Sequence, residues 1–363
     1  MSPLLNVQQK AQVVAVSSGS FMERLVSARR NDAGDLAILD KFPLQPGKTV
    51  AQFVFGGNQF FKPALAHLGG QRWPLLWLQG DVCPGTEISG AQAFLTEDAE
   101  VRYIEQDGRI VGSYWEDGNA QYSLLAGILP ADHQASKGAQ AYSVFEQIES
   151  ALATVGLEFA HVVRTWLYLD QLLAWYDEFN AARTKFFQNR GVCDRLIPAS
   201  TGIGAANPTG AALAAGALAI RPKHERVSIR EVASPLQCEA TEYRSSFARA
   251  VEVAFPSRRY LTISGTASIA PGGASLHNGD VVKQIHTTLD VVEAILKSRG
   301  YAWQDTVRAI GYFRDIHDLP VFDAISRERG IGPLPLAPAY AIVCREDLLF
   351  ELELDAVTHA PLA

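Results

Sequence analysis

Two stretches of the chain repeat one pattern of apolar and polar positions. Over residues 144–155 and 285–299, apolar side chains recur at intervals of three and four positions, which is the periodicity of a helix with one buried face. Gly156 and Gly300 follow these segments, and glycine readily adopts the left-handed backbone conformation that ends many helices. The pattern therefore predicts, in each stretch, an amphipathic helix that ends at a glycine.

Short apolar runs, typical of buried strands, alternate with these helices. They predict strands over 162–169 and 306–313, second helices over 175–187 and 319–328, and closing strands over 198–204, 212–220, 338–344 and 348–357. The Asp107-Gly108 pair inside 101–116 predicts a hairpin with a tight turn. Runs at 73–81 and 259–273 predict a strand upstream of each pair of helices, and we expect these two strands to be counterparts.

The two stretches also share residues at a fixed offset. Four pairs of identical residues stand 144 positions apart: Gly156/Gly300, Val163/Val307, Arg164/Arg308 and Tyr168/Tyr312. A Pro-Ala pair also follows the second helix in both stretches, at Pro198-Ala199 and Pro338-Ala339. Shared order and spacing favour an internal duplication over two unrelated units with coincident residues. Each copy is predicted as β-β-α-β-α-β-β, an α+β arrangement in which a mixed sheet carries both helices on one face.

Length and composition agree with two domains of this kind. The chain has 363 residues, 48% of them hydrophobic and 20% charged, which is enough to bury two cores. The polar segment 221–242 is the expected linker. A net charge of −7 and a pI of about 5.7 argue against binding to nucleic acids or membrane surfaces.

The sequence lacks several features that would change this assignment. No apolar run approaches the roughly 18 residues that span a bilayer, and the first twenty residues do not form a secretion signal, so we expect a cytoplasmic protein. The four cysteines, Cys83, Cys193, Cys238 and Cys344, are scattered and form no CxxC motif, and the histidines form no HExxH motif. We therefore expect free thiols and neither a metal nor another cofactor.

The last strand carries the first candidate for chemistry. Its alternation places Glu351, Glu353 and Asp355 on one face of a sheet and apolar residues on the other. This face is either solvated or part of a pocket. In a pocket, burial would raise the pKa of a carboxyl group until it can donate a proton near neutral pH.

Two arginines are further candidates. Arg164 lies inside the apolar run 162–169, and Arg195 directly precedes the next predicted strand. A charge inside an apolar strand is costly unless it is paired or faces a ligand, and arginine is well suited to binding carboxylates. A structural ion pair is the alternative for both. The segments 200–210 and 264–268 are rich in small residues, which allow either close approach of a ligand or close packing.

The C-terminal half, residues 245–357, resembles the RidA/YjgF superfamily. The segments SFARAVEV, YLTISGTASI, QIHTTLDVVEAILKSRG and PAYAIVC carry the resemblance, and the first half resembles the same fold more weakly. Three features carry a further similarity: the two halves of this kind, the ASTGIG segment, and a cysteine seven residues before Glu351. By these features the whole chain is similar to the chorismatase family. The resemblance implies a chorismate-mutase-like fold for an N-terminal domain, 1–222, and for a C-terminal domain, 223–363, that carries the catalytic acid.

Chorismatases cleave the enolpyruvyl ether of chorismate and release pyruvate without a cofactor. The resemblance implies that Glu351 is the acid that protonates the methylene carbon of this ether. Because chorismate is a dianion, arginines have to face the pocket, and the candidates for substrate binding are Arg164, Arg195, Arg249, Tyr243 and Ser200. Ser200 and Tyr340 stand where RidA deaminases carry an arginine after a Pro-Ala pair, so deamination of imines is not expected.

Members of the chorismatase family differ in their products. The resemblance implies that a glycine and a cysteine, here Gly265 and Cys344, mark the enzymes that form 3-hydroxybenzoate. A small pocket wall would let the ring hydroxyl of the substrate attack in place of water. Hydrolysis to a dihydroxycyclohexadiene carboxylate, mixed 3- and 4-hydroxybenzoate formation, and a non-enzymatic small-molecule-binding role are the alternatives. Both a monomer and a homotrimer are compatible with the sequence.

Overall fold

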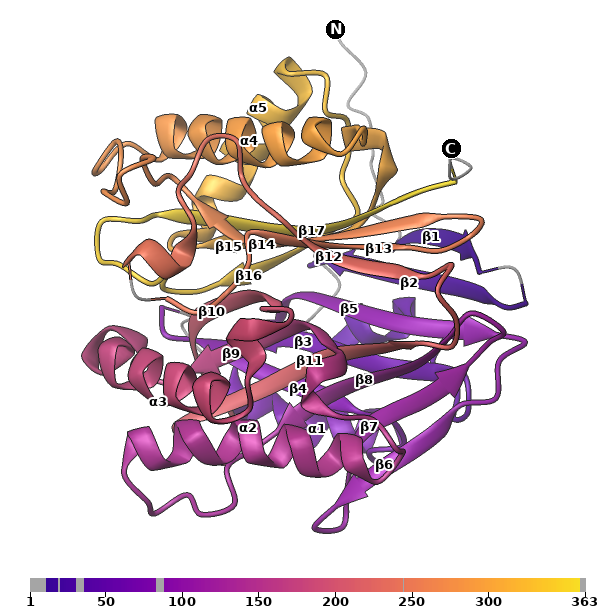
Figure 1. The fold of residues 1–363 in the computed structure, drawn as a ribbon. Coiled ribbons are helices and arrows are strands. Elements are labelled where there is room, and N and C mark those ends of the chain that lie inside the picture. Colours follow the sequence, from indigo (N-terminus) through magenta and orange to yellow (C-terminus); the bar gives the residue numbers. More distant parts are fainter. Residues whose placement is uncertain (1–10, 19, 31–35, 83–87, 244, 360–363) are drawn as a thin grey trace, which may run out of the picture.

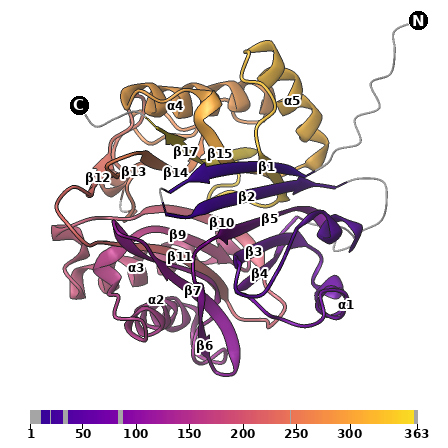
Figure 2. The same cartoon turned by 90° about the vertical axis from the view of Figure 1, so that its right-hand side faces the viewer.

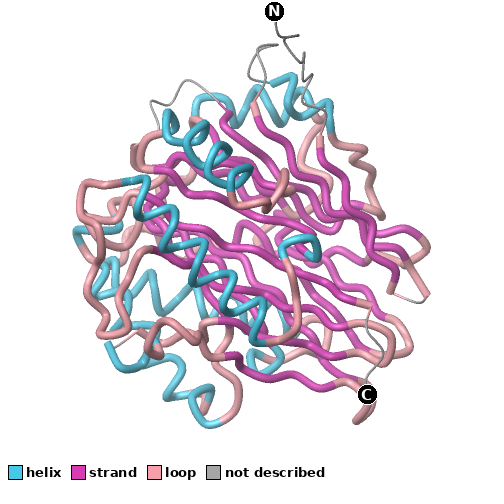
Figure 3. The backbone as a smooth tube through the Cα atoms, turned by 90° about the horizontal axis from the view of Figure 1, so that it is seen from above, coloured by secondary structure: helices cyan, strands magenta, loops and turns pink. Residues whose placement is uncertain are grey.

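The computed structural model describes residues 11–18, 20–30, 36–82, 88–243 and 245–359. An eleven-stranded and a six-stranded mixed sheet lie between two layers of helices (Figure 1). Seen from above, helices lie across the strands, which run side by side through the molecule (Figure 3). The predicted α+β class is therefore confirmed. None of the helices in the described part of the chain is long and apolar enough to cross a membrane.

The six-stranded sheet and its two helices form the last unit of the chain. Its elements are β12 (Ser228–Val232), β13 (Ala250–Ala254), β14 (Arg259–Ala267), α4 (Val281–Ser298), β15 (Thr306–Phe313), α5 (Leu319–Glu328), β16 (Leu336–Tyr340) and β17 (Phe350–Thr358). The sheet order is β12-β13-β14-β17-β15-β16, with β15 and β16 parallel. Both helices cover one face, as predicted (Figure 1). The segment expected to be only a linker contains β12.

The middle unit repeats this topology. Its elements are β6 (Arg102–Gln106), β7 (Arg109–Glu116), β8 (Ala120–Ile128), α2 (Lys137–Ala153), β9 (Val162–Leu169), α3 (Tyr176–Asn189), β10 (Ala199–Ala206) and β11 (Leu213–Pro222). Its order in the sheet, β6-β7-β8-β11-β9-β10, matches the last unit strand for strand. The middle and last units therefore both have three strands before their first helix, one more than predicted. β8 is the counterpart of β14, so the assignment of 73–81 to that role was wrong.

Local sequence explains why the long helices begin earlier than their apolar stripes. The side chain of Ser136 accepts a hydrogen bond from the backbone N–H of Ala139, and Asp280 accepts one from Lys283. Such caps satisfy N–H groups that have no partner in the first turn of a helix. The predicted glycine ends are confirmed, because Gly156 and Gly300 both have positive φ angles, 74° and 72°.

Residues before β6 form a third, shorter unit, which the sequence analysis did not anticipate. It consists of β1 (Gln12–Ser17), β2 (Met22–Arg29), β3 (Thr49–Gly56), α1 (Phe61–His67), β4 (Leu75–Gly80) and β5 (Ile88–Glu97). The order β1-β2-β5-β3-β4, with β3 and β4 parallel, equals that of the last unit without its first strand (Figure 2). A short 3-10 helix, Leu36–Lys41, stands in the place of the first long helix. The part of the chain before β12 thus holds two units, and the domain division at 222/223 stays a prediction.

Three aromatic residues show how the units are arranged. Phe55 on β3, Tyr168 on β9 and Tyr312 on β15 come from equivalent strands, and their ring centroids lie 6.3, 6.3 and 6.4 Å apart. Near-equal spacing of equivalent residues indicates an approximate threefold axis through this cluster. The outer strand of each unit contacts the next unit around the axis, at β4/β8, β10/β14 and β16/β2.

Strand register corrects one part of the predicted repeat. Ile203 on β10 pairs with Tyr168, and Ala339 on β16 pairs with Tyr312. Because the two tyrosines are equivalent, Ala339 corresponds to Ile203 and not to Ala199. The two Pro-Ala pairs therefore match in sequence but not in position, since the loops that precede these strands differ in length.

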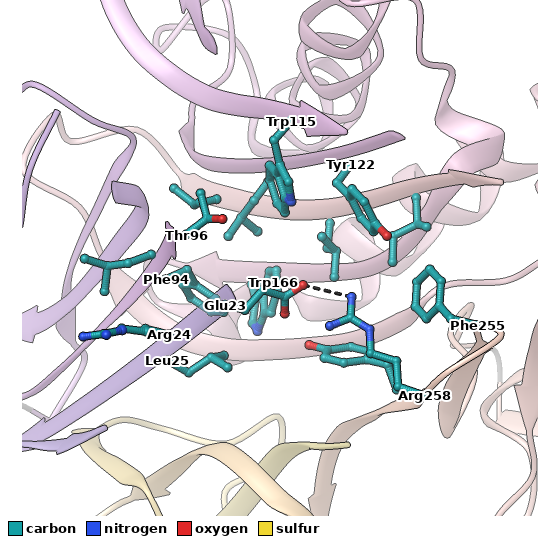
Figure 4. A pocket seen from close by; sticks show the side chains of 16 residues that line it. Glu23, Arg24, Leu25, Phe94, Thr96, Trp115, Tyr122, Trp166, Phe255 and Arg258 are labelled. Carbon is teal, nitrogen blue, oxygen red and sulfur yellow. Dashed lines mark hydrogen bonds and ion pairs between the residues drawn. The ribbon is translucent and has the colours of Figure 1, made fainter. Parts of the chain in front are cut away.

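All three units contribute to a small cavity of about 60 Å³ (Figure 4). Its walls are largely apolar, and the stacked rings of Trp115 and Tyr122 form part of them. A guanidinium N–H of Arg258 donates to a Glu23 carboxylate oxygen at 3.0 Å, as the dashed line in Figure 4 shows. This pair joins the last unit to the first inside a core where an unpaired charge would be strongly destabilising.

Candidate active site

A pocket of about 270 Å³ opens where the middle unit meets the last unit. Helix α3 and strand β10 supply one side, and β14 and β17 supply the other. The residues that line it are Tyr176, Asp177, Asn180, Arg183, Ser200, Gly202, Ser245, Phe247, Arg249, Gly265, Ala267, Ile269, Cys344, Arg345 and Glu351. The pocket therefore depends on both units.

Glu351 is the carboxylic acid of this pocket. The predicted alternation along β17 holds, and its three acidic side chains are buried, with Glu351 only 5% exposed. A solvated acidic face is thus excluded. Burial raises the pKa of the Glu351 carboxyl to about 8, and the charge of Glu353 adds to this, whereas Arg164 and Arg249 act in the opposite direction. A carboxyl group with this pKa is protonated at neutral pH and can serve as a proton donor.

Glu353 lies two residues further along β17, on the same face of the strand, and its pKa is shifted in the opposite direction. Arg164 donates to one of its oxygens at 2.7 Å, Arg308 donates to the other at 2.9 Å, and the indole N–H of Trp166 donates at 2.8 Å. Burial acts to raise the pKa of Glu353, but the two guanidinium groups outweigh it and hold the pKa below its ordinary value. Two carboxyl groups on one strand face are thus held in different protonation states.

Arg164 takes part in this pair and does not line the pocket. It is fully buried and donates to Glu353, to the hydroxyl of Thr201 at 2.6 Å and to the carbonyl of Ile263 at 2.9 Å. Arg164 is also not among the described residues that line the pocket. The structure therefore favours the ion-pair alternative for Arg164 over direct substrate binding, and Arg164 influences the pocket through Glu353 and Thr201.

Gly265 lies directly against the acid. Its backbone N–H donates to the hydroxyl of Thr201 at 3.0 Å. A Cβ atom at this position would overlap the Glu351 carboxyl and come within 3.0 Å of the Thr201 methyl group. The absence of a side chain at Gly265 is what leaves room for the carboxyl group, and this distinguishes Gly265 from Ala267, which pairs with Glu351 across the sheet.

Cys344 lines the pocket close to Glu351. Burial raises the pKa of its thiol to about 12, and the charge of the nearby Glu351 is the second cause. A thiol with this pKa stays neutral and is a poor nucleophile. Cys344 is therefore a small apolar part of the wall, as the sequence indicated.

Three guanidinium groups reach the pocket. Arg183 donates to the amide oxygen of Asn180 at 2.6 Å and to the hydroxyl of Ser245 at 2.7 Å. Arg249 donates twice to the carbonyl of Cys238, at 2.9 and 2.6 Å, and Arg345 donates to the carbonyl of Gly273 at 2.6 Å. Among the contacts given for these three groups, all acceptors are neutral oxygens, which orient the guanidinium groups at the pocket.

The remaining predicted residues fall in different places. Ser200 lines the pocket and accepts a hydrogen bond from the Thr165 hydroxyl at 2.9 Å. Arg195 is exposed and does not belong to the described residues that line the pocket, so we do not place it in the site. Tyr243 ends a short 3-10 helix, Ala240–Tyr243, and its side chain lies outside the described part of the structure.

The sequence analysis missed Arg183, Arg345 and Thr201. Arg183 left a detectable signal, because it stands four residues after Phe179 and three before Phe186 on the apolar stripe of α3, where an arginine has to be explained. Arg345 and Thr201 left none, because each is an ordinary polar residue in a loop or strand until the two units come together.

Comparison with known proteins agrees with this geometry. The family model of the N-terminal part of FkbO/Hyg5-like chorismatases matches residues 96–219. A 3-hydroxybenzoate synthase from Streptomyces hygroscopicus is 27% identical over 295 residues, which cover 72% of this chain and 80% of the relative. A chorismatase from Streptomyces rapamycinicus is 27% identical over 236 residues, which cover 58% of this chain and 68% of the relative.

The chain is similar to chorismatases in sequence and in fold. A solved chorismatase structure superimposes with a TM-score of 0.64 and covers 95% of this chain and 100% of its own, at 18% identity, which extends the similarity in fold to nearly the whole chain. The chorismatase family model ends within β11, so it covers β6 to β10 and the two pocket elements α3 and β10. A RutC family protein from Pyrococcus horikoshii matches a shorter stretch, 102 residues at 28% identity.

Proposed function

We propose that this protein is an enzyme that converts chorismate into 3-hydroxybenzoate and pyruvate. The observation that carries the proposal is a nearly fully buried carboxylic acid, Glu351, in a pocket that three arginines also line. The chorismatase and 3-hydroxybenzoate synthase relatives support the substrate and the product. The substrate is thus a small molecule with two carboxylate groups.

Glu351 supplies the proton that starts the reaction. Protonation of the enol ether at its methylene carbon produces an oxocarbenium ion, and the carboxylate left on Glu351 stabilises that cation. The neighbouring ring hydroxyl then attacks the ring carbon that carries the ether, so that a new C–O bond forms, the hydroxyl loses its proton, the bond to the ether oxygen breaks and pyruvate leaves. The transferred oxygen next takes up a proton and gives up its bond to its original carbon, and the carbon that this oxygen has joined loses its hydrogen as a proton. Because chorismate and the two products contain the same atoms in total, the ring returns one proton as it becomes aromatic, and Glu351 is reprotonated.

The arginines of the pocket recognise the dianion. Guanidinium groups bind carboxylates through paired hydrogen bonds and keep their charge at every physiological pH. Arg183 on α3 and Arg345 after β16 lie on opposite sides of the unit boundary, since one belongs to the middle unit and the other to the last. We assign one substrate carboxylate to each side, with Arg249 beside Glu351 as the third cation.

Gly265 and Cys344 favour the aromatic product. Both are small, and both adjoin Glu351, so the ring can approach the acid closely with its own hydroxyl group next to the reacting carbon. A bulkier wall would displace the ring and admit water, which would give the dihydroxycyclohexadiene carboxylate. Mixed 3- and 4-hydroxybenzoate formation is the remaining alternative within the same chemistry.

One experiment tests the proposal directly. The purified protein is incubated with chorismate, and pyruvate and the aromatic acids are quantified by chromatography against the spontaneous background. We expect 3-hydroxybenzoate and pyruvate in equal amounts, and no pyruvate above background would refute enzymatic cleavage. A role restricted to binding would instead leave chorismate intact while it occupies the pocket.

The three related units also bear on the oligomeric state. Their outer strands already meet one another around an approximate threefold axis within one chain. We therefore propose that the active species is a monomer, because the boundary that forms the pocket is complete without a second chain.

A further inference from the structure

Strand β14 bulges where it passes the acidic face of β17. The ladder between the two strands shifts register between Ile263 and Thr266. Within this shift two residues of β14, Ser264 and Gly265, lie opposite Glu353 alone on β17. An extra residue of this kind interrupts the ladder and changes the direction of the groups beside it, and such bulges are common next to active sites. The backbone of Gly265 is therefore available for contacts outside its own sheet.

Two hydrogen bonds from β10 of the middle unit hold this bulge. The backbone N–H of Ser200 donates to the hydroxyl of Ser264 at 2.9 Å, and the backbone N–H of Gly265 donates to the hydroxyl of Thr201 at 3.0 Å. The second bond is made by the residue whose missing side chain leaves room for the Glu351 carboxyl. The space that the acid occupies is therefore fixed from the neighbouring unit.

The hydroxyl of Thr201 makes three hydrogen bonds. It accepts from Gly265 and, at 2.6 Å, from the guanidinium group of Arg164. Burial raises the pKa of Glu353, and Arg164 and Arg308 lower it below its ordinary value. A hydrogen bond from the Thr201 hydroxyl acts in the same direction as the two arginines. Because a hydroxyl has one donor and two acceptor sites, these three bonds fix its orientation and join Gly265 to the ion pair.

Thr201 does not face the substrate. Its side chain is buried, with 1% exposed, and it is not among the described residues that line the pocket, whereas its neighbours Ser200 and Gly202 are. This follows from the alternation of a strand, in which successive side chains point to opposite faces. Thr201 therefore acts on the acid through Gly265 and Glu353, without a contact to chorismate.

The boundary between the last unit and the first, which we call the second boundary, shows the same construction without the acid. The residues that pair with the equivalent aromatic positions place Gly90 where Glu351 stands, and Gln92 where Glu353 stands. Arg308 donates to the side-chain oxygen of Gln92 at 3.2 Å. The ladder between β2 and β5 is regular along its described pairs, so β2 has no bulge there.

The position of Thr201 also differs at the other boundaries. Strand register places Ala337 there at the second boundary and Leu76 at the third, which joins the first unit to the middle one. At the third boundary Ala214 takes the place of the acid, although β8 does bulge, at Gly127. A bulge thus occurs with and without an acid, whereas the hydroxyl occurs at the boundary that has the acid.

We infer that Thr201 is a positioning residue for proton transfer from Glu351, because its hydroxyl holds Gly265 where the carboxyl group has room to act. The inference rests on the proposed function, since it concerns the same reaction. It extends the site to a residue that does not touch the substrate and that belongs to a different unit from the acid.

Steady-state kinetics with chorismate test it. Thr201→Val keeps the shape of the side chain and removes the hydroxyl, so kcat should fall about tenfold or more while KM stays within about twofold. Thr201→Ser keeps the hydroxyl and should retain most of kcat. Thr262→Val, three residues before Gly265 on β14, is the matched control. It removes a buried hydroxyl that has no hydrogen-bond partner within the described part of the chain, and it should change neither kcat nor KM.

The outcomes separate this inference from the proposed function. A wild-type kcat in Thr201→Val, or an equal loss in Thr201→Ser, would overturn the positioning role and leave the proposed function standing. An equal loss in Thr262→Val, or a loss that appears in KM instead of kcat, would also overturn it. A wild-type protein that releases no pyruvate would overturn both. If Thr201→Val does not fold, the smaller Thr201→Ala replaces it and should show the same fall in kcat at constant KM.

Discussion

The hydroxyl groups of Tyr168 and Tyr312 lie 2.8 Å apart and form a hydrogen bond between residues separated by 144 positions. The two tyrosines are equivalent members of the repeat, and the third equivalent residue is Phe55, whose ring contacts both. Tyr312 also donates to Glu353 at 3.3 Å. The two copies of the repeat therefore contact each other through these tyrosines, next to the ion pair of Arg164 and Glu353 beside the candidate active site.

This tyrosine pair should contribute measurably to stability. Tyr168→Phe should lower the free energy of unfolding by about 1 kcal/mol, the usual net value of one buried hydrogen bond, and Tyr312→Phe should lower it by more, because it also removes the hydrogen bond to Glu353. The double variant should lose less than the sum of the two, because both single changes break the same bond. Denaturant unfolding of the four proteins measures this, and strict additivity would contradict the coupling. Tyr142→Phe on α2 is the control, because the hydroxyl of Tyr142 makes a solvent-exposed hydrogen bond, with Asn189.

The raised pKa of Glu351 predicts a specific pH dependence. Its carboxyl has to be protonated to act, so kcat for pyruvate release should be high below pH 8 and should fall as the pH rises through about 8. Glu351→Gln should lower kcat by roughly 10²-fold or more and remove this dependence. A full pH profile of both proteins measures it. An activity that instead rises above pH 8 would show that Glu351 acts as a base.

Glu353 should influence the pH at which kcat falls as Glu351 loses its proton. Its charge adds to the pKa of Glu351, so Glu353→Gln should lower that pKa and move the fall in activity to lower pH. The variant also leaves Arg164 and Arg308 partly unpaired, which should cost about 3–5 kcal/mol in stability. Gln92→Glu, at the equivalent position of the second boundary, is the control for a change of charge beside Arg308. An unmoved pH profile would rule out Glu353 as a tuning residue.

The product should depend on the pocket wall. Cys344→Val places a bulkier side chain next to Glu351 and narrows the pocket there. The product should therefore shift from 3-hydroxybenzoate toward the dihydroxycyclohexadiene carboxylate. Chromatography of the products, with labelled water to detect incorporated oxygen, measures the ratio. Cys193→Val, an exposed cysteine, is the matched control. The wall argument fails if Cys344→Val leaves the product ratio unchanged.

Gly265 should tolerate no side chain. A Cβ atom there would overlap the Glu351 carboxyl, so Gly265→Ala should displace the acid and reduce kcat strongly, by tenfold or more as an order-of-magnitude estimate. Ala267→Gly, two residues further on the same strand, removes a Cβ atom and is the control. Wild-type turnover in Gly265→Ala would show that the carboxyl has another position from which it can act.

Light scattering coupled to gel filtration measures the oligomeric state. We expect the mass of one chain, 39.5 kDa, because the strands that pair between units are already paired within the chain. A trimeric mass would mean that the three units of each chain use further surfaces to associate.

Local patterns were sufficient to determine most elements and one acid. The strands 162–169 and 306–313 and the helix 319–328 have the predicted bounds, because their apolar runs and glycine or loop boundaries are local properties of the chain. The alternation that placed Glu351 and Glu353 on one face is equally local. The resemblance to chorismatases, read from segments of the C-terminal half, agrees with the relatives that match the chain.

Tertiary structure alone decided how these elements combine. The third unit was hidden because its helices are short and its strands share no obvious residues with the other two, so that only the pairing order of its strands reveals it. Arg164 could be read equally as a ligand-binding or a paired residue until the middle and last units were placed side by side. Burial, charge pairing and the pKa of Glu351 arise from residues far apart in the chain, and no local pattern encodes such distances.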